Sequence, residues 1–213
     1  MNLFFFGGTF DPPHIGHYEI ANKCLKLADK VLVIPNNLSP ENKLLQTDVF
    51  HRVEMLKILF KDTDVIIDRY EINSEKKNYT IHTVNYLADK YENYKITMVL
   101  GLDQLKKINN WYKSKEIKES VDILCFNRNN IDVMPEIYEN YVVDKSFKVN
   151  ISSTKIRESI NKKEGNTMKN NLHITLLAAF SLFINGCGKN KWEPENHIVF
   201  IDYTTSCEAM DDY

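Results

Sequence analysis

Short apolar runs alternate with helix-like segments through the first 126 residues of this chain, and this alternation limits the fold more than any other feature. The runs are almost continuously apolar, which is typical of strands buried on both faces of a parallel sheet. They occupy residues 3–6, 31–34, 65–67, 96–100 and 123–126. Amphipathic helical patterns lie between them at residues 16–28, 49–60 and 81–91, with a candidate short helix at 116–120. We therefore expect right-handed βαβ units in an α/β, Rossmann-like, doubly wound parallel sheet.

The first apolar run leads directly into residues 7–17, which read GGTFDPPHIGH. This segment follows the carboxyl end of a strand, where sheets of this class bind their ligands. Its two glycines are expected to make a tight turn that lets the backbone approach a ligand, and its two prolines to fix φ where a helix begins. Gly16 keeps a side chain out of the space beside His14 and His17. Such a helix start can bind phosphate through its N–H groups, whereas the plainer interpretation is a strand-turn-helix with two surface histidines.

A second candidate phosphate site lies far along the chain at residues 151–157, which read ISSTKIR. Ser152 or Ser153 is expected to cap a helix that starts there. Hydroxyl and backbone N–H groups can bind phosphate, and Arg157 can bind it through two hydrogen bonds. Alone, this pattern is typical of an ordinary capped helix. Together with the histidine segment, it favours a functional, phosphate-binding role over an ordinary capped helix.

The histidine segment resembles that of the nucleotidyltransferase superfamily with a His-x-Gly-His motif. Within it, residues 1–163 are similar to the bacterial nicotinate-nucleotide adenylyltransferases, whose Ile-Ser-Ser-Thr-x-x-Arg motif matches residues 151–157. The resemblance implies the nucleotidyltransferase fold. It also implies that the 5′-phosphate of nicotinate mononucleotide attacks the α-phosphorus of ATP, giving deamido-NAD and pyrophosphate in NAD biosynthesis. Such a transfer needs alignment and charge stabilisation more than covalent chemistry. Mg²⁺ is expected to arrive with ATP, without a dedicated cluster of protein ligands, and the ionised phosphate needs no general base.

The resemblance also implies roles for individual residues. His14 and His17 are the expected catalytic residues, because they can donate hydrogen bonds to the reacting phosphoryl group. Trp111 is expected to stack on the nicotinate ring, while Thr80 and Tyr112 hold its carboxylate. The expected contacts to ATP and its phosphates are Gly7, Gly8, Thr9, Phe10, Lys43, Arg52, Gly101, Asp103, Ser152, Ser153, Thr154 and Arg157. Lys43 and Arg52 have a plainer interpretation, as a solvated lysine and an arginine on the surface of a helix.

Several positions depart from the family pattern. Asn42 precedes Lys43 where the family has a histidine, Asn78 replaces a serine, and His82 replaces an acid. Arg128 is followed by two asparagines instead of Pro-Gly, so a contact with adenine there is less well supported. The change at His82 puts in doubt how the segment around Thr80 is held.

Composition limits the class of protein further. The formal net charge of −2 gives no broad basic surface for nucleic acid. The four cysteines have no metal-ligand spacing, and Cys24 and Cys125 lie in apolar patterns, where we expect reduced core thiols. Met1 leads straight into a predicted strand, so a secretory signal is not expected there. These features favour a cytoplasmic enzyme that binds small molecules; a homo-oligomer remains open, and a membrane association is not expected.

The last part of the chain does not follow the family. We divide the chain into a nucleotidyltransferase domain, residues 1–166, and an atypical tail, residues 167–213. Residues 168–187 contain a methionine, a lysine, an apolar stretch and Cys187, as in a bacterial lipoprotein signal peptide. The tail is interpreted first as the start of an unrelated protein joined to the domain. The alternatives are a helix that packs in place of the family's last helix, or an internal membrane element.

Three other functions remain open from the sequence. The chain could be a nucleotidyltransferase acting on phosphopantetheine or glycerol phosphate, although Trp111 and Thr80 favour nicotinate. A class I aminoacyl-tRNA synthetase shares the histidine motif, but this chain is too short and residues 113–115 poorly match the second synthetase signature. Finally, the altered C-terminus could leave an inactive nucleotide-binding product. Pyrophosphate release with each candidate substrate separates these possibilities.

Overall fold

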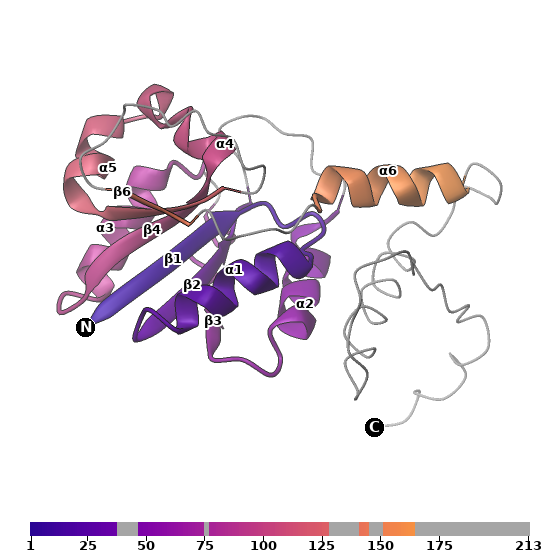
Figure 1. The fold of residues 1–213 in the computed structure, drawn as a ribbon, viewed down its shortest axis with the longest axis horizontal. Coiled ribbons are helices and arrows are strands. Elements are labelled where there is room, and N and C mark those ends of the chain that lie inside the picture. Colours follow the sequence, from indigo (N-terminus) through magenta and orange to yellow (C-terminus); the bar gives the residue numbers. More distant parts are fainter. Residues whose placement is uncertain (38–46, 75–76, 128–140, 145–150, 165–213) are drawn as a thin grey trace. The chain divides into compact units, whose positions relative to one another are not determined.

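Six parallel strands form one sheet at the centre of the computed structural model, which describes residues 1–37, 47–74, 77–127, 141–144 and 151–164 (Figure 1). The strands are β1 (Asn2–Gly8), β2 (Lys30–Pro35), β3 (Val65–Ile67), β4 (Lys95–Gly101), β5 (Asp122–Phe126) and β6 (Tyr141–Asp144). The helices are α1 (Ile15–Leu25), α2 (Val49–Leu59), α3 (Thr80–Lys90), α4 (Leu102–Leu105), α5 (Ser114–Ser120) and α6 (Ser153–Glu164), with a short 3₁₀ helix, η1 (Ile108–Asn110).

The strand order confirms the predicted doubly wound sheet. The strands lie in the order β3-β2-β1-β4-β5-β6, and all five pairings are parallel. The chain winds outward from β1 through β2 to β3, and then crosses to β4 on the other side of β1. In register, Phe5 of β1 pairs with Leu32 of β2 and with Met98 of β4. The order reverses between β1 and β4, and their carboxyl ends are where this class of sheet binds its ligand.

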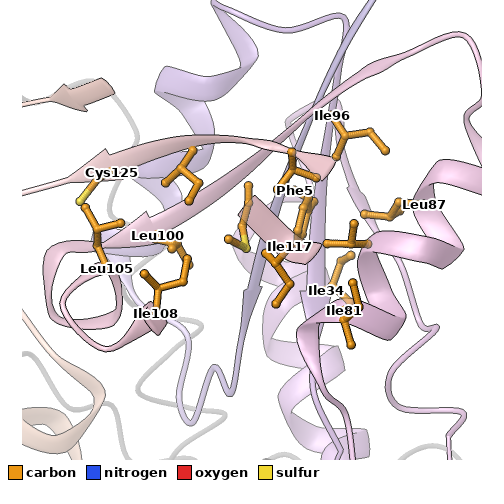
Figure 2. Close-up of a cluster of buried hydrophobic side chains, with 14 of the residues drawn as sticks. Phe5, Ile34, Ile81, Leu87, Ile96, Leu100, Leu105, Ile108, Ile117 and Cys125 are labelled. Carbon is orange, nitrogen blue, oxygen red and sulfur yellow. The ribbon is translucent and has the colours of Figure 1, made fainter. Parts of the chain in front are cut away.

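Alternation of side chains along the strands fills both faces of the sheet. Phe5 and Ile34 point into a buried cluster with Ile81 and Leu87 of α3 and Ile117 of α5, as Figure 2 shows. Helices α3 and α5 therefore cover one face, and α1 and α2 lie on the other face (Figure 1). Strands buried on both faces need apolar residues at nearly every position, which explains the continuous apolar runs in the sequence.

Most predicted elements are confirmed, with shifts at their ends. The first helix begins at Ile15, after both prolines, so the expectation that prolines open the helix is wrong by two residues. It ends at Leu25 instead of residue 28, because residues 26–28 form a turn whose N–H groups bond back to Lys23 and Cys24. Asp48 caps α2 by accepting a hydrogen bond from the Phe50 N–H group at 2.8 Å. Strand β6 and helices α4 and η1 were not expected from the sequence.

The two cysteines of the described core are free thiols, as expected. Cys24 of α1 and Cys125 of β5 are both fully buried. Burial raises the pKa of each thiol to about 12, with a smaller contribution from Asp144 at Cys24 and from Asp103 at Cys125. A thiol with a raised pKa carries little thiolate and is unreactive. Both residues therefore act as small core side chains.

Contacts divide the chain into two units, Met1–Glu158 and Ser159–Tyr213. The domain boundary expected at residue 166 lies outside the described residues, as do Cys187 and the lipoprotein-like segment. Among the helices that the structure describes, none combines the length and the apolar character needed to span a bilayer.

Candidate active site

A cleft of about 1120 Å³ opens at the carboxyl ends of β1 and β4, the place that the sheet topology indicates. It collects residues from distant parts of the first unit: the β1–α1 connection, the start of α3, the β4–η1 connection and the start of α6. The expected site residues that line it are Gly7, Gly8, Thr9, Phe10, His14, His17, Thr80, Gly101, Asp103, Trp111, Tyr112, Ser152, Ser153, Thr154 and Arg157.

The turn after β1 is made by Phe10 and not by the two glycines. Gly7 and Gly8 are the last residues of β1, paired with Ile34 and Pro35, and neither has a positive φ. Phe10 has a φ of 52°, in the left-handed region that large side chains rarely adopt. The expected tight glycine turn is therefore wrong. A side chain at Gly7 would meet nothing within 4 Å, so this glycine leaves the strand end open to the cleft.

The two histidines lie against each other at the start of α1. Their rings stack with centroids 3.7 Å apart, and both side chains are almost completely buried. A Cβ atom at Gly16 would lie only 3.0 Å from the His14 ring, which explains the glycine in the His-x-Gly-His spacing. The His14 backbone N–H donates to Nδ1 of His17 at 3.1 Å. In the neutral imidazole the proton of His17 therefore lies on Nε2, which is a hydrogen-bond donor.

The two candidate phosphate segments contact each other. Ser152 caps α6, since its hydroxyl accepts from the Lys155 N–H at 3.3 Å. The Ser153 hydroxyl donates to the Pro12 carbonyl at 2.8 Å, and the Arg157 guanidinium donates to the Asp11 carbonyl. These bonds join segments more than 140 residues apart in the sequence and hold the start of α6 against the β1–α1 connection.

Aromatic side chains line the part of the cleft near α3. Tyr79 precedes α3 and Thr80 is its first residue. The Tyr79 and Tyr112 rings lie 4.9 Å apart, and His82 contacts both rings from the first turn of α3. Trp111 is partly buried against the apolar cluster, whereas Tyr112 is 52% exposed. The three residues expected on the nicotinate side, Thr80, Trp111 and Tyr112, therefore line one cleft.

A buried polar network holds the segment before α3. The Thr83 hydroxyl donates to the Glu71 carboxyl at 2.6 Å, and the Asn78 amide donates to the Glu71 carbonyl at 3.0 Å. The Asn78 oxygen accepts from the Asn37 N–H at 3.1 Å, which ties this segment to the end of β2. Burial raises the pKa of Glu71 to about 7, opposed by the bond from Thr83. These bonds hold the segment that leads to Thr80.

Two expected phosphate contacts, Lys43 and Arg52, are not among the described residues that line the cleft. Lys43, with Asn42 before it, lies outside the described residues, and so does Arg128. Arg52 is completely buried and does not line the cleft. Its Nη1 donates to the Thr9 carbonyl at 2.6 Å and its Nε to the Thr47 carbonyl at 3.2 Å. Arg52 was expected to reach phosphates from the helix that follows residues 35–43, and this expectation is corrected: its guanidinium group lies in the protein interior, on the carbonyls of Thr9 and Thr47.

Sequence reasoning missed several polar residues of the cleft. They are Asn36, Glu71, Gln104, Lys107 and Asn110. Asn36 directly follows β2, so the rule that ligands bind at carboxyl ends of strands could have found it. The last three follow β4 through α4 and η1, two short helices without a clear sequence pattern. Glu71 lies in a polar segment that carries no motif.

Among the described residues, no three histidine, cysteine, aspartate or glutamate side chains lie close enough together to hold a metal ion. Asp103 is the exposed carboxylate at the end of β4 that lines the cleft, and its Oδ2 accepts from Gln104 at 3.1 Å.

The chain resembles known nucleotidyltransferases in fold. A nicotinic acid mononucleotide adenylyltransferase of Plasmodium falciparum, solved as a complex with NaAD, superposes with a TM-score of 0.66 at 18% identity. The superposition covers 85% of this chain and 97% of that chain. At this identity the likeness establishes the shared Rossmann-like nucleotidyltransferase fold.

Sequence comparison places the chain more narrowly. Residues 5–159 match the family model described as cytidylyltransferase-like. The nicotinate-nucleotide adenylyltransferase of Bacillus subtilis is 34% identical over 163 residues, which is 75% of this chain and 85% of that protein. A protein of Aliarcobacter butzleri, named as a probable nicotinate-nucleotide adenylyltransferase, is 34% identical over 173 residues, 76% of this chain and 90% of that protein. The chain therefore belongs to the nicotinate-nucleotide adenylyltransferases of the cytidylyltransferase-like family.

Proposed function

We propose that the cleft binds ATP and nicotinate mononucleotide together and transfers the AMP moiety of ATP to the mononucleotide, giving deamido-NAD and pyrophosphate. The observation that carries this proposal is that one cleft contains the histidine pair, the Ser153–Arg157 segment and the Trp111–Tyr112 pair. The first two suit phosphates and the third suits an aromatic ring. The named relatives point to the same reaction.

Besides the short α4, whose first turn carries Asp103, three longer helices have N-termini at the cleft, and these favour anionic ligands. Helices α1, α3 and α6 begin at cleft-lining segments, and none has an acidic residue in its first turn. Unpaired N–H groups and the helix dipole favour an anion at such positions. Both substrates are polyanions, because each carries phosphate and nicotinate adds a carboxylate. The α1 and α6 termini would take phosphates, and the α3 terminus at Thr80 would take the carboxylate.

The transfer requires alignment of the two substrates and stabilisation of charge. The mononucleotide phosphate is ionised at neutral pH and attacks the α-phosphorus of ATP, while the bond to pyrophosphate breaks. Nε2 of His17 donates to an oxygen of the reacting phosphoryl group as charge develops there. His14 supplies a second ring, stacked on His17, and the Phe10 N–H group a backbone donor. No residue is needed as a general base.

Recognition of nicotinate involves the aromatic residues. Trp111 stacks on the pyridinium ring, an interaction worth about 0.5–2 kcal/mol. Thr80 and Tyr112 hold the carboxylate, and Asn78 with Glu71 fixes the segment that presents Thr80. Asp103, a carboxylate that lines the cleft, would contact a ribose hydroxyl or the Mg²⁺ that accompanies ATP. The free thiols of Cys24 and Cys125 support a reducing compartment, the cytoplasm.

The experiment is pyrophosphate release by the purified full-length chain with ATP and one acceptor at a time. Nicotinate mononucleotide should be used with a kcat/KM well above that of nicotinamide mononucleotide, because the amide has no charge for the α3 N-terminus. Phosphopantetheine and glycerol phosphate should give no release above background. A preference for either of these acceptors would assign the cleft to another nucleotidyltransferase, and no release with any acceptor would indicate an inactive product.

A further inference from the structure

Arg52 is a charged residue in the interior of the first unit. It lies in α2 and is completely buried, which is rare for arginine unless the guanidinium is well paired. Burial lowers the pKa of Arg52, and the nearby carboxylates of Asp11 and Asp48 oppose that effect. Burial of a guanidinium group carries a large desolvation penalty, so an apolar residue would fill this position at a lower cost in free energy. The contacts of the guanidinium group therefore indicate why an arginine is there.

The guanidinium group binds backbone carbonyls on two segments. Nε donates to the Thr47 carbonyl just before α2, at 3.2 Å. Nη1 donates to the Thr9 carbonyl at 2.6 Å, a short charge-assisted bond to a residue 43 positions earlier. Only a planar fork can reach both carbonyls at once from one position, which a lysine ammonium group cannot reproduce. Arg52 thus connects α2 to the loop that follows β1.

This bond fixes the orientation of one peptide group in the cleft. In a trans peptide the C=O and N–H groups point in opposite directions. With the Thr9 carbonyl turned to Arg52, the N–H group of Phe10 faces away from α2, and Thr9 and Phe10 both line the cleft. Phe10 is also held in a left-handed conformation, with a φ of 52°, which persists only where its surroundings enforce it.

The ring of Phe10 links the orientation of this peptide to the position of His17. It packs edge-on against His17 with centroids 5.0 Å apart, and edge-on against Phe6 at 5.5 Å. A different orientation of the Thr9–Phe10 peptide would move this ring, and with it the packing around His17. The contacts therefore run from Arg52 through the peptide to the catalytic histidine.

We propose that Arg52 is a positioning residue for the transfer reaction: from behind the loop it fixes the Thr9–Phe10 peptide, and so holds the Phe10 N–H group and the His17 ring in place for the phosphates of ATP. The inference rests on the proposed function and assigns Arg52 no contact with either substrate.

The test compares full-length Arg52→Lys with the wild type and with the control Lys57→Met. Lys57 lies on the same helix in an exposed ion pair with Glu54. Pyrophosphate release gives kcat and the KM of each substrate, and circular dichroism gives the folded fraction at the assay temperature. For Arg52→Lys, kcat should fall by about 10- to 100-fold, since misplacement by a fraction of an ångström is costly in a preorganised site. The KM of nicotinate mononucleotide should stay within about twofold, because the nicotinate contacts are untouched.

Arg52→Gln is the second variant and should lower kcat similarly, since it keeps a planar donor group but reaches less far. A kcat for a folded variant that equals the wild-type value, or a loss that only matches the unfolded fraction, would overturn the positioning role. If neither variant folds, Arg52 serves stability and the proposal is wrong. An inactive wild type with every acceptor would instead contradict the proposed function, so the two failures are distinguishable.

Discussion

The bond between the His14 backbone and Nδ1 of His17 is the contact that most limits the chemistry of single residues in this site. It uses the one nitrogen of His17 that faces its own helix start, and it leaves Nε2 as the donor. The stacked His14 ring and the edge of Phe10 hold the imidazole on its other sides. The donor is therefore oriented before substrate arrives, which is how a preorganised site lowers a barrier.

His17→Ala removes this donor. We expect kcat to fall by roughly 100-fold or more, since loss of one well-placed donor costs about 3–4 kcal/mol of transition-state stabilisation. The thermal midpoint should change much less than kcat. The matched control is His51→Ala on α2, a residue that does not line the cleft and should keep its turnover. Near-normal turnover of folded His17→Ala would show that His17 is not catalytic.

The raised pKa of Glu71 predicts that the stability of the chain depends on pH. Burial raises its pKa from 4.5 to about 7, so the folded chain binds this proton more tightly than the unfolded chain does. The associated stability is fully present below about pH 4.5 and is lost as the pH rises through 7, a total of about 3 kcal/mol. Glu71→Gln cannot ionise, so its stability should change less between pH 5 and 8 than that of the wild type, and at pH 8 it should be the more stable protein.

Urea denaturation of both proteins at several pH values measures this effect. Glu116→Gln, in an exposed pair with Lys113, is the control and should follow the wild-type curve. Parallel pH profiles for the wild type and Glu71→Gln would mean that Glu71 is ionised throughout this range.

At the scale of elements, the sequence predicted what local patterns determine. Five strands and the main helices were recognisable because burial on both faces demands continuous apolar runs and amphipathic helices. Strand β6 was not predicted, because its four residues include only a short apolar pair. The turn at Phe10 was not predicted, because a positive φ is expected at glycine and two glycines lie nearby in the sequence. The burial of Arg52 depends on an acceptor 43 residues away, which no local pattern reveals.

The segment from η1 to α5 presents Trp111 and Tyr112 to the cleft. Stacking of Trp111 on nicotinate is made equally in the ground state and the transition state, so Trp111→Ala should mainly raise the KM of nicotinate mononucleotide. The KM of ATP and kcat should change little. Phe50→Ala, which removes an aromatic ring that is 64% exposed on α2, is the control. A rise in the KM of ATP instead would mean that Trp111 lies at the adenylate side.

At the scale of the whole molecule, every residue that lines the cleft in the described part of the chain comes at or before Arg157. A chain that ends after Asn166 keeps all of them. If residues 167–213 are the start of an unrelated protein, the shortened chain should keep its turnover and be more soluble, because an exposed apolar segment promotes aggregation. Thermal melts of both chains, with and without the substrates, measure the effect. A melting temperature many degrees lower after truncation would show that the tail packs on the domain.

The central claim is that the cleft joins AMP from ATP to nicotinate mononucleotide, and the fate of the α-phosphate tests it most directly. The full-length chain is incubated with nicotinate mononucleotide and ATP labelled at the α-phosphate, and the products are separated. The account predicts that the label appears in deamido-NAD while pyrophosphate is released unlabelled. Label that stays in ATP or leaves as free AMP, with no labelled dinucleotide formed, would contradict it.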